Sequence, residues 1–507
     1  MKTNPHGAPT VATPQGDIRE YGPHRLLRRD RASGDGPNVL FLSLDDCNDW
    51  VGYLRNHPGT STPNIDALAA ESLNFSKAYC SAPICKAARN SVLFGLHPFE
   101  SGVYDHYAES NANHARLVAE TPSLIDDFWA AGYAALGAGK VFHDGQLLRW
   151  NSYKRTLFYA DGAGRGNEAL GPGRFDENWL SPYDGKPIGK GEGWTGRHVD
   201  FGPSGREPDD DPDGVSAAWV REQLRAEWRK PFLLAFGVLA THVPWRVPQR
   251  FYDLHPLESI VVPDIQPNDL ETLPGYARDS IIDQLYAFET LNAAGLWARS
   301  VQAYQASMSY TDYLVGTVLD TLASSRYADD TIVVLWSDHG FHLGEMLHFH
   351  KFTLWERATH VPFLLKIPGA TTNGTAYHEP VSMLDLGPTL APLCDVRIHA
   401  PHSGANVLPE VLGTTAARTN AGARPVLSTW QEHNFAIRQG PWRYIRYRTG
   451  ESELYDHRTD PDERSNLANQ LPYTTIQADL DAQLPPGPDD VDHRKIALAS
   501  TLARWSH

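Results

Sequence analysis

Four short apolar segments, each running directly into charged or imidazole side chains, constrain the fold of this chain more than any other feature. The segments are Val39–Leu44, Ala134–Ala138, Phe232–Leu239 and Ile332–Trp336. Nearly continuous apolar runs of this length are typical of parallel strands that are buried on both faces. Because helix-like segments alternate with them, we expect an α/β fold, in which helices sandwich a large mixed, mostly parallel sheet.

The polar residues at the ends of these segments indicate a shared site. Asp45-Asp46, Lys140 and His143, His242, and Asp338-His339 follow the four segments. In open α/β sheets the ligand crevice lies at the carboxyl ends of the strands, so these side chains would converge if the strands are parallel neighbours. Three carboxylates and an imidazole suit a hard divalent cation, Ca²⁺ or Mg²⁺ rather than Zn²⁺. The alternative is that each aspartate caps a helix or turn and each histidine is structural.

A second group of candidate residues surrounds Cys85. The segment KAARNSVLF after it predicts a helix, which places Arg89 one turn beyond Cys85 on the same face. A helix N-terminus depresses a thiol pKa to roughly 3.5–7.5 and attracts anions. The alternative is a buried, inert cysteine. Lys351, about a dozen residues beyond Asp338, can reach back to the same crevice, and its alternative is a solvated loop lysine.

The domain organisation follows from changes in composition. We expect an N-terminal arm over residues 1–36, a catalytic α/β domain over 37–412, and a C-terminal subdomain over 413–507. A stretch rich in Gly, Pro and acidic residues, about 144–213, reads as a surface insertion. The C-terminal subdomain has short β-like runs separated by turn signals, followed by a helix within Tyr473–Leu484, and is predicted to be α+β with a short antiparallel sheet.

The helix boundaries are expected from capping signals. Thr62-Pro63 and Thr121-Pro122 each place an N-cap residue before a proline at the first helical position. Gln302–Ser324 reads as one long amphipathic helix leading into the last apolar strand.

Composition excludes several function classes. The net charge of −16 argues against nucleic acid as a partner, because phosphate binding needs a concentrated basic surface. Four cysteines in 507 residues exclude a disulfide framework. The N-terminus lacks the apolar core of a secretory signal, and the longest apolar runs, of about ten residues, are too short to span a bilayer. We therefore expect a cytoplasmic protein without a membrane partner, and the sequence does not indicate an oligomeric state.

Six segments in order resemble a known family. NVLFLSLDD, TPNIDALAAESLNFSKAY, CKAAR, GKVFH, THVPW and SDHGFHLGE are similar to motifs of the type I sulfatases, in the alkaline-phosphatase-like superfamily. GKVFH and the spacing are most similar to the iduronate-2-sulfatase branch, although that branch has Lys-Pro where this chain has Ala240-Thr241. The resemblance covers roughly residues 37–470.

The resemblance implies a metal centre and a modified nucleophile. Type I sulfatases use formylglycine, made by oxidation of a cysteine in a C-x-P/A-x-R signature, which CKAAR matches with Ala87 in the third position. Cys85 would then be the formylglycine precursor, and its hydrated gem-diol would attack sulfur and also bind the metal. The other protein ligands of Ca²⁺, or alternatively of Mg²⁺ or Mn²⁺, would be Asp45, Asp46, Asp338 and His339.

The same resemblance assigns the remaining site residues. Arg89 would hold the formylglycine diol, with His143 assisting. Three residues would contact the sulfate: Lys140, His242 and Lys351. Either His242 or Lys351 would protonate the leaving alcohol. A positioned acid of this kind contributes roughly 10²–10⁴ in rate.

The function expected from these residues is hydrolysis of the S–O bond of a sulfated carbohydrate or another small organic sulfate. Its partners would be the small sulfated substrate and a formylglycine-generating maturation enzyme. One alternative is a phosphonate monoester or phosphodiester hydrolase with the same formylglycine-metal site, and another is an inactive protein that binds sulfated glycans. Candidate sugar-binding side chains, each of which has a core residue as its alternative, are Trp50, His106, Trp245, Arg246, His342, His348, His350 and Trp430.

Overall fold

The fold is that of a computed structural model, which describes residues 36–143, 149–154, 201–266, 268–280, 282–369, 374–411 and 423–487. The predicted arm, apart from its last residue, lies outside these ranges, as does most of the predicted insertion. So do the two ends of the predicted C-terminal subdomain. No helix in the described ranges is long and apolar enough to cross a membrane.

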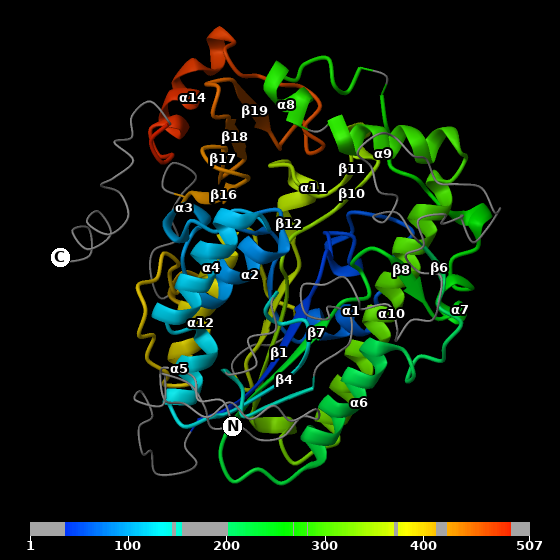
Figure 1. The fold of residues 1–507 in the computed structure, drawn as a ribbon, viewed down its shortest axis with the longest axis vertical. Coiled ribbons are helices and arrows are strands. Elements are labelled where there is room, and N and C mark those ends of the chain that lie inside the picture. The colour runs from blue at the N-terminus through cyan, green and yellow to red at the C-terminus, as the bar shows by residue number, and fades with distance from the viewer. Residues whose placement is uncertain are drawn as a thin grey trace.

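One eight-stranded sheet forms the centre of the molecule (Figure 1). In spatial order its strands are β14 (Ala376–Tyr377), β2 (Leu73–Phe75), β13 (Phe363–Lys366), β9 (Thr331–Ser337), β1 (Asn38–Leu44), β7 (Phe232–Val238), β4 (Ala134–Gly139) and β5 (Ser152–Lys154). β13 runs antiparallel to β9 and β2, and the other neighbours are parallel. The predicted mixed, mostly parallel sheet is confirmed.

Helices cover both faces of this sheet because alternate strand residues point to opposite sides. In β1, Leu40, Leu42 and Leu44 enter one apolar core, while Val39 and Phe41 enter the other. The first core lies under α1 (Pro63–Ala70), α6 (Pro212–Arg225), α7 (Gln249–Tyr252) and α10 (Trp297–Ala323). The second lies under α2 (Cys85–Phe94), α4 (Ala108–Glu120), α5 (Leu124–Ala130) and α12 (Leu386–Leu393).

Further strands and helices lie outside the main sheet and the helices that cover it. The small strands are β3 (Ala78–Tyr79), β6 (Phe201–Pro203), β8 (Trp245–Val247), β10 (His342–Leu343), β11 (Phe349–His350), β12 (His360–Val361) and β15 (Val381–Ser382). The remaining α-helices described before residue 412 are α3 (Pro98–Ser101), α8 (Gly275–Ser280), α9 (Ile282–Ala293), α11 (Glu356–Thr359) and α13 (Leu408–Val411).

The C-terminal part forms the predicted antiparallel sheet with one helix. Its strands are β16 (Val426–Thr429), β17 (Phe435–Gln439), β18 (Trp442–Arg446) and β19 (Ser452–Asp456), and α14 (Thr474–Asp481) packs on them. A buried ionic cluster joins this sheet to α11, since Arg443 of β18 pairs with both Glu356 and Glu463.

Three local predictions differ from the structure. α5 begins at Leu124 rather than after Thr121, because Ser123 and Asp126 form a reciprocal capping box there. α10 begins at Trp297, five residues before the predicted start. The predicted surface insertion is wrong at both ends: β5 is the edge strand of the main sheet, and β6 pairs with β8.

Candidate active site

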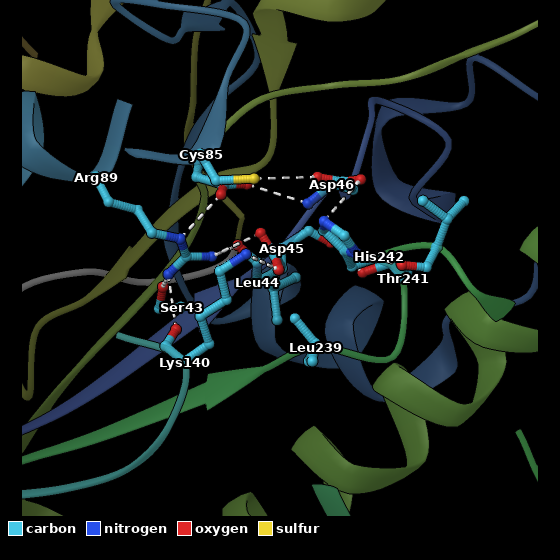
Figure 2. A network of polar contacts seen from close by, with 12 residues as sticks. Ser43, Leu44, Asp45, Asp46, Cys85, Arg89, Lys140, Leu239, Thr241 and His242 are labelled. Atoms are coloured by element: carbon cyan, nitrogen blue, oxygen red, sulfur yellow. Dashed lines mark hydrogen bonds and ion pairs between the residues drawn. The ribbon is translucent and has the colours of Figure 1, made fainter. Parts of the chain in front are cut away.

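The four polar strand ends meet at one edge of the sheet. β9, β1, β7 and β4 are consecutive parallel neighbours, and Leu44 is in register with Ser337 on one side and Val238 on the other. The residues that follow these strands therefore gather around one point, as Figure 2 shows for Asp45, Asp46, Lys140 and His242. The predicted convergence is confirmed.

Cys85 is the first residue of α2 and lies buried against this edge. Its Sγ lies 3.1 Å from Lys351 Nζ, 3.2 Å from His339 Nε2 and 3.8 Å from Asp46 Oδ1. Burial alone would raise the pKa of the Cys85 thiol, but Lys140, Lys351 and His339 outweigh it and hold that pKa well below its ordinary value. The inert-cysteine alternative does not fit this environment.

The other three cysteines have the opposite character. Cys47, Cys80 and Cys394 are buried, and burial raises the pKa of each thiol, that of Cys394 to about 12. Arg443 opposes this shift at Cys80 and does not outweigh it. Their thiols stay protonated at neutral pH, so the structure separates Cys85 from them by its electrostatic surroundings.

Arg89 joins the strand ends through its hydrogen bonds. It lies one turn beyond Cys85 on α2, and its side chain is fully buried. The guanidinium donates to Asp338 Oδ2 at 2.9 Å and Asp45 Oδ1 at 3.2 Å. Its other bonds go to Ser43 Oγ and to the carbonyls of residues 44, 140 and 141. These bonds tie β1, β9 and the segment after β4 into one unit, and the contact with a diol stays a prediction.

The predicted metal ligands form a compact buried cluster. One donor atom from each of five residues lies within 4.8 Å of the others: Asp45, Asp46, Cys85, Asp338 and His339. The Oδ2 atom of Asp46 is buried without a hydrogen-bond partner. The backbone of Asp46 has φ 54°, a left-handed conformation that costs about 1–3 kcal/mol and recurs at functional sites. Together with the carboxylate-rich donor set, the orphaned oxygen fits a hard divalent cation.

The charges within this cluster are unevenly distributed. Burial raises the pKa of Asp45, yet Lys140 and Arg89 outweigh it and hold that pKa below its ordinary value. Burial raises the pKa of Asp338 to about 7, although Arg89 and His339 oppose the shift. Burial lowers the pKa of His339, but Asp338 reverses this and raises it to about 9. Arg89, Lys140 and Lys351 match the three carboxylates in number, so it is the donor set and the orphaned Asp46 oxygen that favour a bound cation.

The three predicted sulfate contacts surround the same cluster. Lys140 Nζ lies 2.6 Å from Asp45 Oδ2, and Lys351 Nζ lies 2.7 Å from Asp46 Oδ1. His242 Nε2 lies 4.0 Å from Asp46 Oδ2. Lys351 is 3% exposed, so the alternative of a solvated loop lysine is wrong.

His143 lies at the margin of this group. Its ring stacks on that of His106, with centroids 4.6 Å apart. Its predicted help to Arg89 stays a prediction.

Three residues at the site were missed by sequence reasoning. Ser43 Oγ accepts a bond from Arg89 at 2.8 Å, and its only sequence signal is a polar residue inside an apolar strand. Thr241 Oγ1 donates to the carbonyl of Asp45 at 2.5 Å, at a position where the chain departs from the iduronate-type Lys-Pro. Asp213 accepts from the backbone N–H of Leu239 at 2.8 Å and lies in a run that reads as an acidic insertion.

The predicted sugar-binding residues divide into two groups. Five of them are buried: Trp50, Trp245, His342, His348 and His350. The prediction of a substrate surface is wrong for the two tryptophans, which are core residues, and stays a prediction for the three histidines. Trp50 and Trp245 belong to the apolar core on the α10 side of the sheet. The residues that keep some exposure are His106, Arg246 and Trp430.

Comparison with known proteins identifies the family. Residues 37–396 match the Sulfatase family, and residues 344–487 match the family described as "N-sulphoglucosamine sulphohydrolase, C-terminal". The first match covers well over half of the chain, so the chain belongs to the sulfatase family and is a sulfatase enzyme. The predicted family is confirmed.

Individual relatives agree with this assignment. The chain is 34% identical to a sulfatase of Formosa agariphila, over 89% of this chain and 87% of that protein. It is 28% identical to the choline-sulfatase of Rhizobium meliloti, over 88% and 85%. It is 30% identical to iduronate 2-sulfatase of Homo sapiens, over 67% and 61%.

Solved structures show the same fold. A 2-O GAG sulfatase superposes with a TM-score of 0.65 at 21% identity, covering 88% of this chain and 91% of that one. A phosphonate monoester hydrolase from Silicibacter pomeroyi superposes with a TM-score of 0.69 at 16% identity, covering 88% and 94%. At these identities the likeness establishes the fold alone.

Proposed function

We propose that the protein hydrolyses the S–O bond of a sulfated carbohydrate or another small organic sulfate, with a formylglycine derived from Cys85 as nucleophile and a divalent cation as cofactor. The observation that carries the proposal is the environment of Cys85. Its Sγ lies within 3.2 Å of Lys351 and His339, beside three buried carboxylates. The sulfate ester hydrolases among its relatives support the same reaction class.

The cation proposed for this site is Ca²⁺, with Mg²⁺ or Mn²⁺ as alternatives. Asp45, Asp46, Asp338 and His339 would hold it together with residue 85. When bound, such a cation neutralises negative charge and acts as a Lewis acid on an oxygen of the substrate. A hard ion is favoured because most of the donors are carboxylate oxygens.

The chain's own residues provide the rest of the chemistry. A sulfate ester is wrapped in negative oxygens, so a nucleophile reaches its sulfur only where cations offset that charge. Lys140 and Lys351 are buried at hydrogen-bonding distance from the cluster and would bind the sulfate oxygens. His242 approaches from the loop after β7 and, with Lys351, is placed to protonate the leaving alcohol. Formylglycine would supply a diol whose sulfated form expels sulfate as the aldehyde reforms.

A second candidate function is phosphonate monoester hydrolysis. The fold of the Silicibacter pomeroyi phosphonate monoester hydrolase favours it, since that enzyme covers 88% of this chain. A phosphonate monoester also carries a tetrahedral anionic centre, which the same cations would bind. An inactive protein that binds sulfated glycans fits the site less well. Such a protein would have no need of the complete set of charged residues that surrounds Cys85 here.

The decisive experiment combines kinetics with mass analysis. The protein is expressed with a formylglycine-generating maturation enzyme, and kcat/KM is compared on an aryl sulfate and an aryl phosphonate. A preference for the sulfate supports the proposal, and a preference for the phosphonate by orders of magnitude overturns it. Mass analysis of the Cys85 peptide tests maturation, and finding only unmodified thiol would contradict the formylglycine mechanism.

The substrate class is then found by a screen. The screen contains sulfated mono- and oligosaccharides, including 2-O-sulfated uronates, together with choline sulfate and aryl sulfates. The uronates and choline sulfate are included because the relatives include an iduronate 2-sulfatase and a choline-sulfatase.

A further inference from the structure

We propose that a stack of three aromatic rings, His350, Phe352 and Trp430, positions Lys351 against Cys85, and that the C-terminal subdomain is thereby part of the active site. The meaning of this for catalysis rests on the proposed function, in which Lys351 binds the sulfate. The positioning itself is a separate structural claim. Trp430 would act through Phe352 and Lys351 without touching the reacting atoms.

Lys351 needs external support to keep its place. Its Nζ must stay 3.1 Å from Cys85 Sγ and 2.7 Å from Asp46 Oδ1, atoms that belong to two other segments. A lysine side chain is long and has many rotamers, so its geometry depends on how firmly its backbone is fixed.

The backbone on both sides of Lys351 is strained. His350 has φ 123° and Phe352 has φ 78°, which are left-handed conformations that residues with a β-carbon rarely adopt. Such conformations persist only where surrounding contacts hold them. Contacts made by His350 and Phe352 must therefore hold these two φ values.

The two strained residues stack on each other. The rings of His350 and Phe352 lie 4.8 Å apart with an interplanar angle of 13°. The two stacked residues are the sequence neighbours of Lys351, so the stack restrains the backbone on both sides of it. Two hydrogen bonds add to it: His348 Nε2 bonds the carbonyl of Lys351 at 2.8 Å, and the N–H of Phe352 donates to Pro83 at 3.3 Å.

Trp430 extends the stack from the C-terminal subdomain. Its ring lies 5.1 Å from that of Phe352 with an interplanar angle of 26°. Both rings pack on Ala82, Ile84 and Ala87, the small apolar cluster around the start of α2. Trp430 therefore covers the outer side of the ring that adjoins Lys351.

The segment that carries Trp430 is also bonded to the loop that leads into Cys85. The N–H of Thr429 donates to the carbonyl of Ser81 at 2.8 Å, and Ser428 Oγ donates to the carbonyl of Cys80 at 2.5 Å. The end of β16 is thus fixed to the nucleophile's loop, and its next residue stacks on the neighbour of Lys351. One element of the C-terminal subdomain sets the distance between the nucleophile and the lysine.

The test measures the accessibility of Lys351 directly. Wild type, Trp430→Ala and Trp430→Phe are labelled with acetic anhydride, and the peptide containing Lys351 is quantified by mass spectrometry. Trp442→Ala is the matched control, because Trp442 lies on the same C-terminal sheet and packs on Tyr473 away from the site. We expect labelling of Lys351 to rise at least about fivefold in Trp430→Ala, and to stay near the wild-type level in Trp430→Phe and Trp442→Ala.

Unchanged labelling in Trp430→Ala overturns the proposal, as does an equal rise in Trp442→Ala. Should Trp430→Ala fail to fold, Phe352→Leu interrupts the same stack and decides the question in the same way. Labelling needs no turnover, so a protein without sulfatase activity would refute the proposed function and leave this test intact.

Kinetics then distinguishes positioning from direct substrate contact. Inhibition by inorganic sulfate should weaken in Trp430→Ala, and kcat should fall by one common factor for aryl and sugar sulfates. A loss confined to the sugar sulfate, with unchanged inhibition by inorganic sulfate, would show that Trp430 contacts the leaving group and would overturn the positioning role.

Discussion

Replacement of Arg89 by lysine is expected to destabilise the protein although the positive charge is kept. The Arg89 guanidinium uses all three of its nitrogens as donors, and its acceptors lie on β1, at the end of β9 and after β4. A lysine ammonium carries three donors on a single atom and cannot span these acceptors. Arg89→Lys would therefore leave several buried acceptors without a donor.

The size of the effect follows from these lost bonds. Both ion pairs of Arg89, to Asp338 and to Asp45, join side chains of 0% exposure. A buried acceptor left unsatisfied costs about 1–3 kcal/mol, and a broken buried ion pair costs about 3–5 kcal/mol. Because a lysine would keep part of the Coulomb attraction, we expect the free energy of unfolding to fall by about 3–5 kcal/mol rather than by the sum of all these losses.

Urea unfolding followed by tryptophan fluorescence measures this change. The matched control is Arg326→Lys, whose ion pair with Glu227 is 60% and 82% exposed, and the free energy of unfolding should change there by less than about 0.5 kcal/mol. A loss below about 1 kcal/mol in Arg89→Lys would refute the reasoning, because it would show that one ammonium can satisfy the acceptors of three strand ends.

Three further outcomes are expected. Cys85→Ala should abolish turnover of an aryl sulfate and leave the far-ultraviolet circular dichroism unchanged, and normal turnover in that variant would exclude Cys85 as the nucleophile. Ca²⁺ at about a hundred times its Kd should raise the free energy of unfolding by about 2.7 kcal/mol, and Asp338→Asn should lose this gain because one ligand of the cluster is removed. Burial lowers the pKa of His348 to about 4, while an unfolded histidine titrates at about 6.5. Between these two pH values the unfolded chain binds more protons than the folded one. The free energy of unfolding therefore decreases as the pH falls from about 6.5 to about 4. This residue should make the protein about 2 kcal/mol less stable at pH 5 than at pH 7, and His348→Gln should show a difference smaller by that amount in urea unfolding at the two pH values.

The part of the site that sequence reasoning could reach is the part encoded locally. Apolar runs mark β1, β4, β7 and β9, and the residue after each run is fixed at the carboxyl end of its strand. A helix beginning at Cys85 likewise places Arg89 one turn away on the same face. These signals need no knowledge of distant contacts, which is why the candidate metal ligands and Cys85 could be predicted together from the sequence.

The parts that failed depend on contacts between distant segments. Trp50 and Trp245 carry no local sign that α10 covers them, so a buried tryptophan and a sugar platform look alike in the sequence. β5 has only three residues and gains its place by pairing with β4. The stack of Phe352 and Trp430 joins a strained loop to a separate subdomain, and neither residue predicts the other.

The formal charges of the site give a final, testable consequence for anion binding. Negative charges come from three carboxylates and a Cys85 thiolate, and the lasting positive charges come from Arg89, Lys140 and Lys351. In the metal-free protein His339, whose pKa is raised to about 9, adds a fourth positive charge, and these sum to 0. A bound divalent cation would replace that proton, because a metal-ligating histidine is neutral, and would change the sum to +1, and replacement of the thiolate by a neutral group would change it to +2.

A bound divalent cation would thus make this pocket of an acidic protein more positive. We expect inorganic sulfate to inhibit the Ca²⁺-loaded enzyme, and calorimetry to show tighter sulfate binding to Ca²⁺-loaded Cys85→Ala than to the same variant in a chelator. The comparison uses Cys85→Ala because it removes the thiolate from both states and isolates the contribution of the cation. Equal sulfate affinity with and without Ca²⁺ would mean that Lys140 and Lys351 bind the anion by themselves, and the charge balance derived from the buried carboxylates would then be wrong.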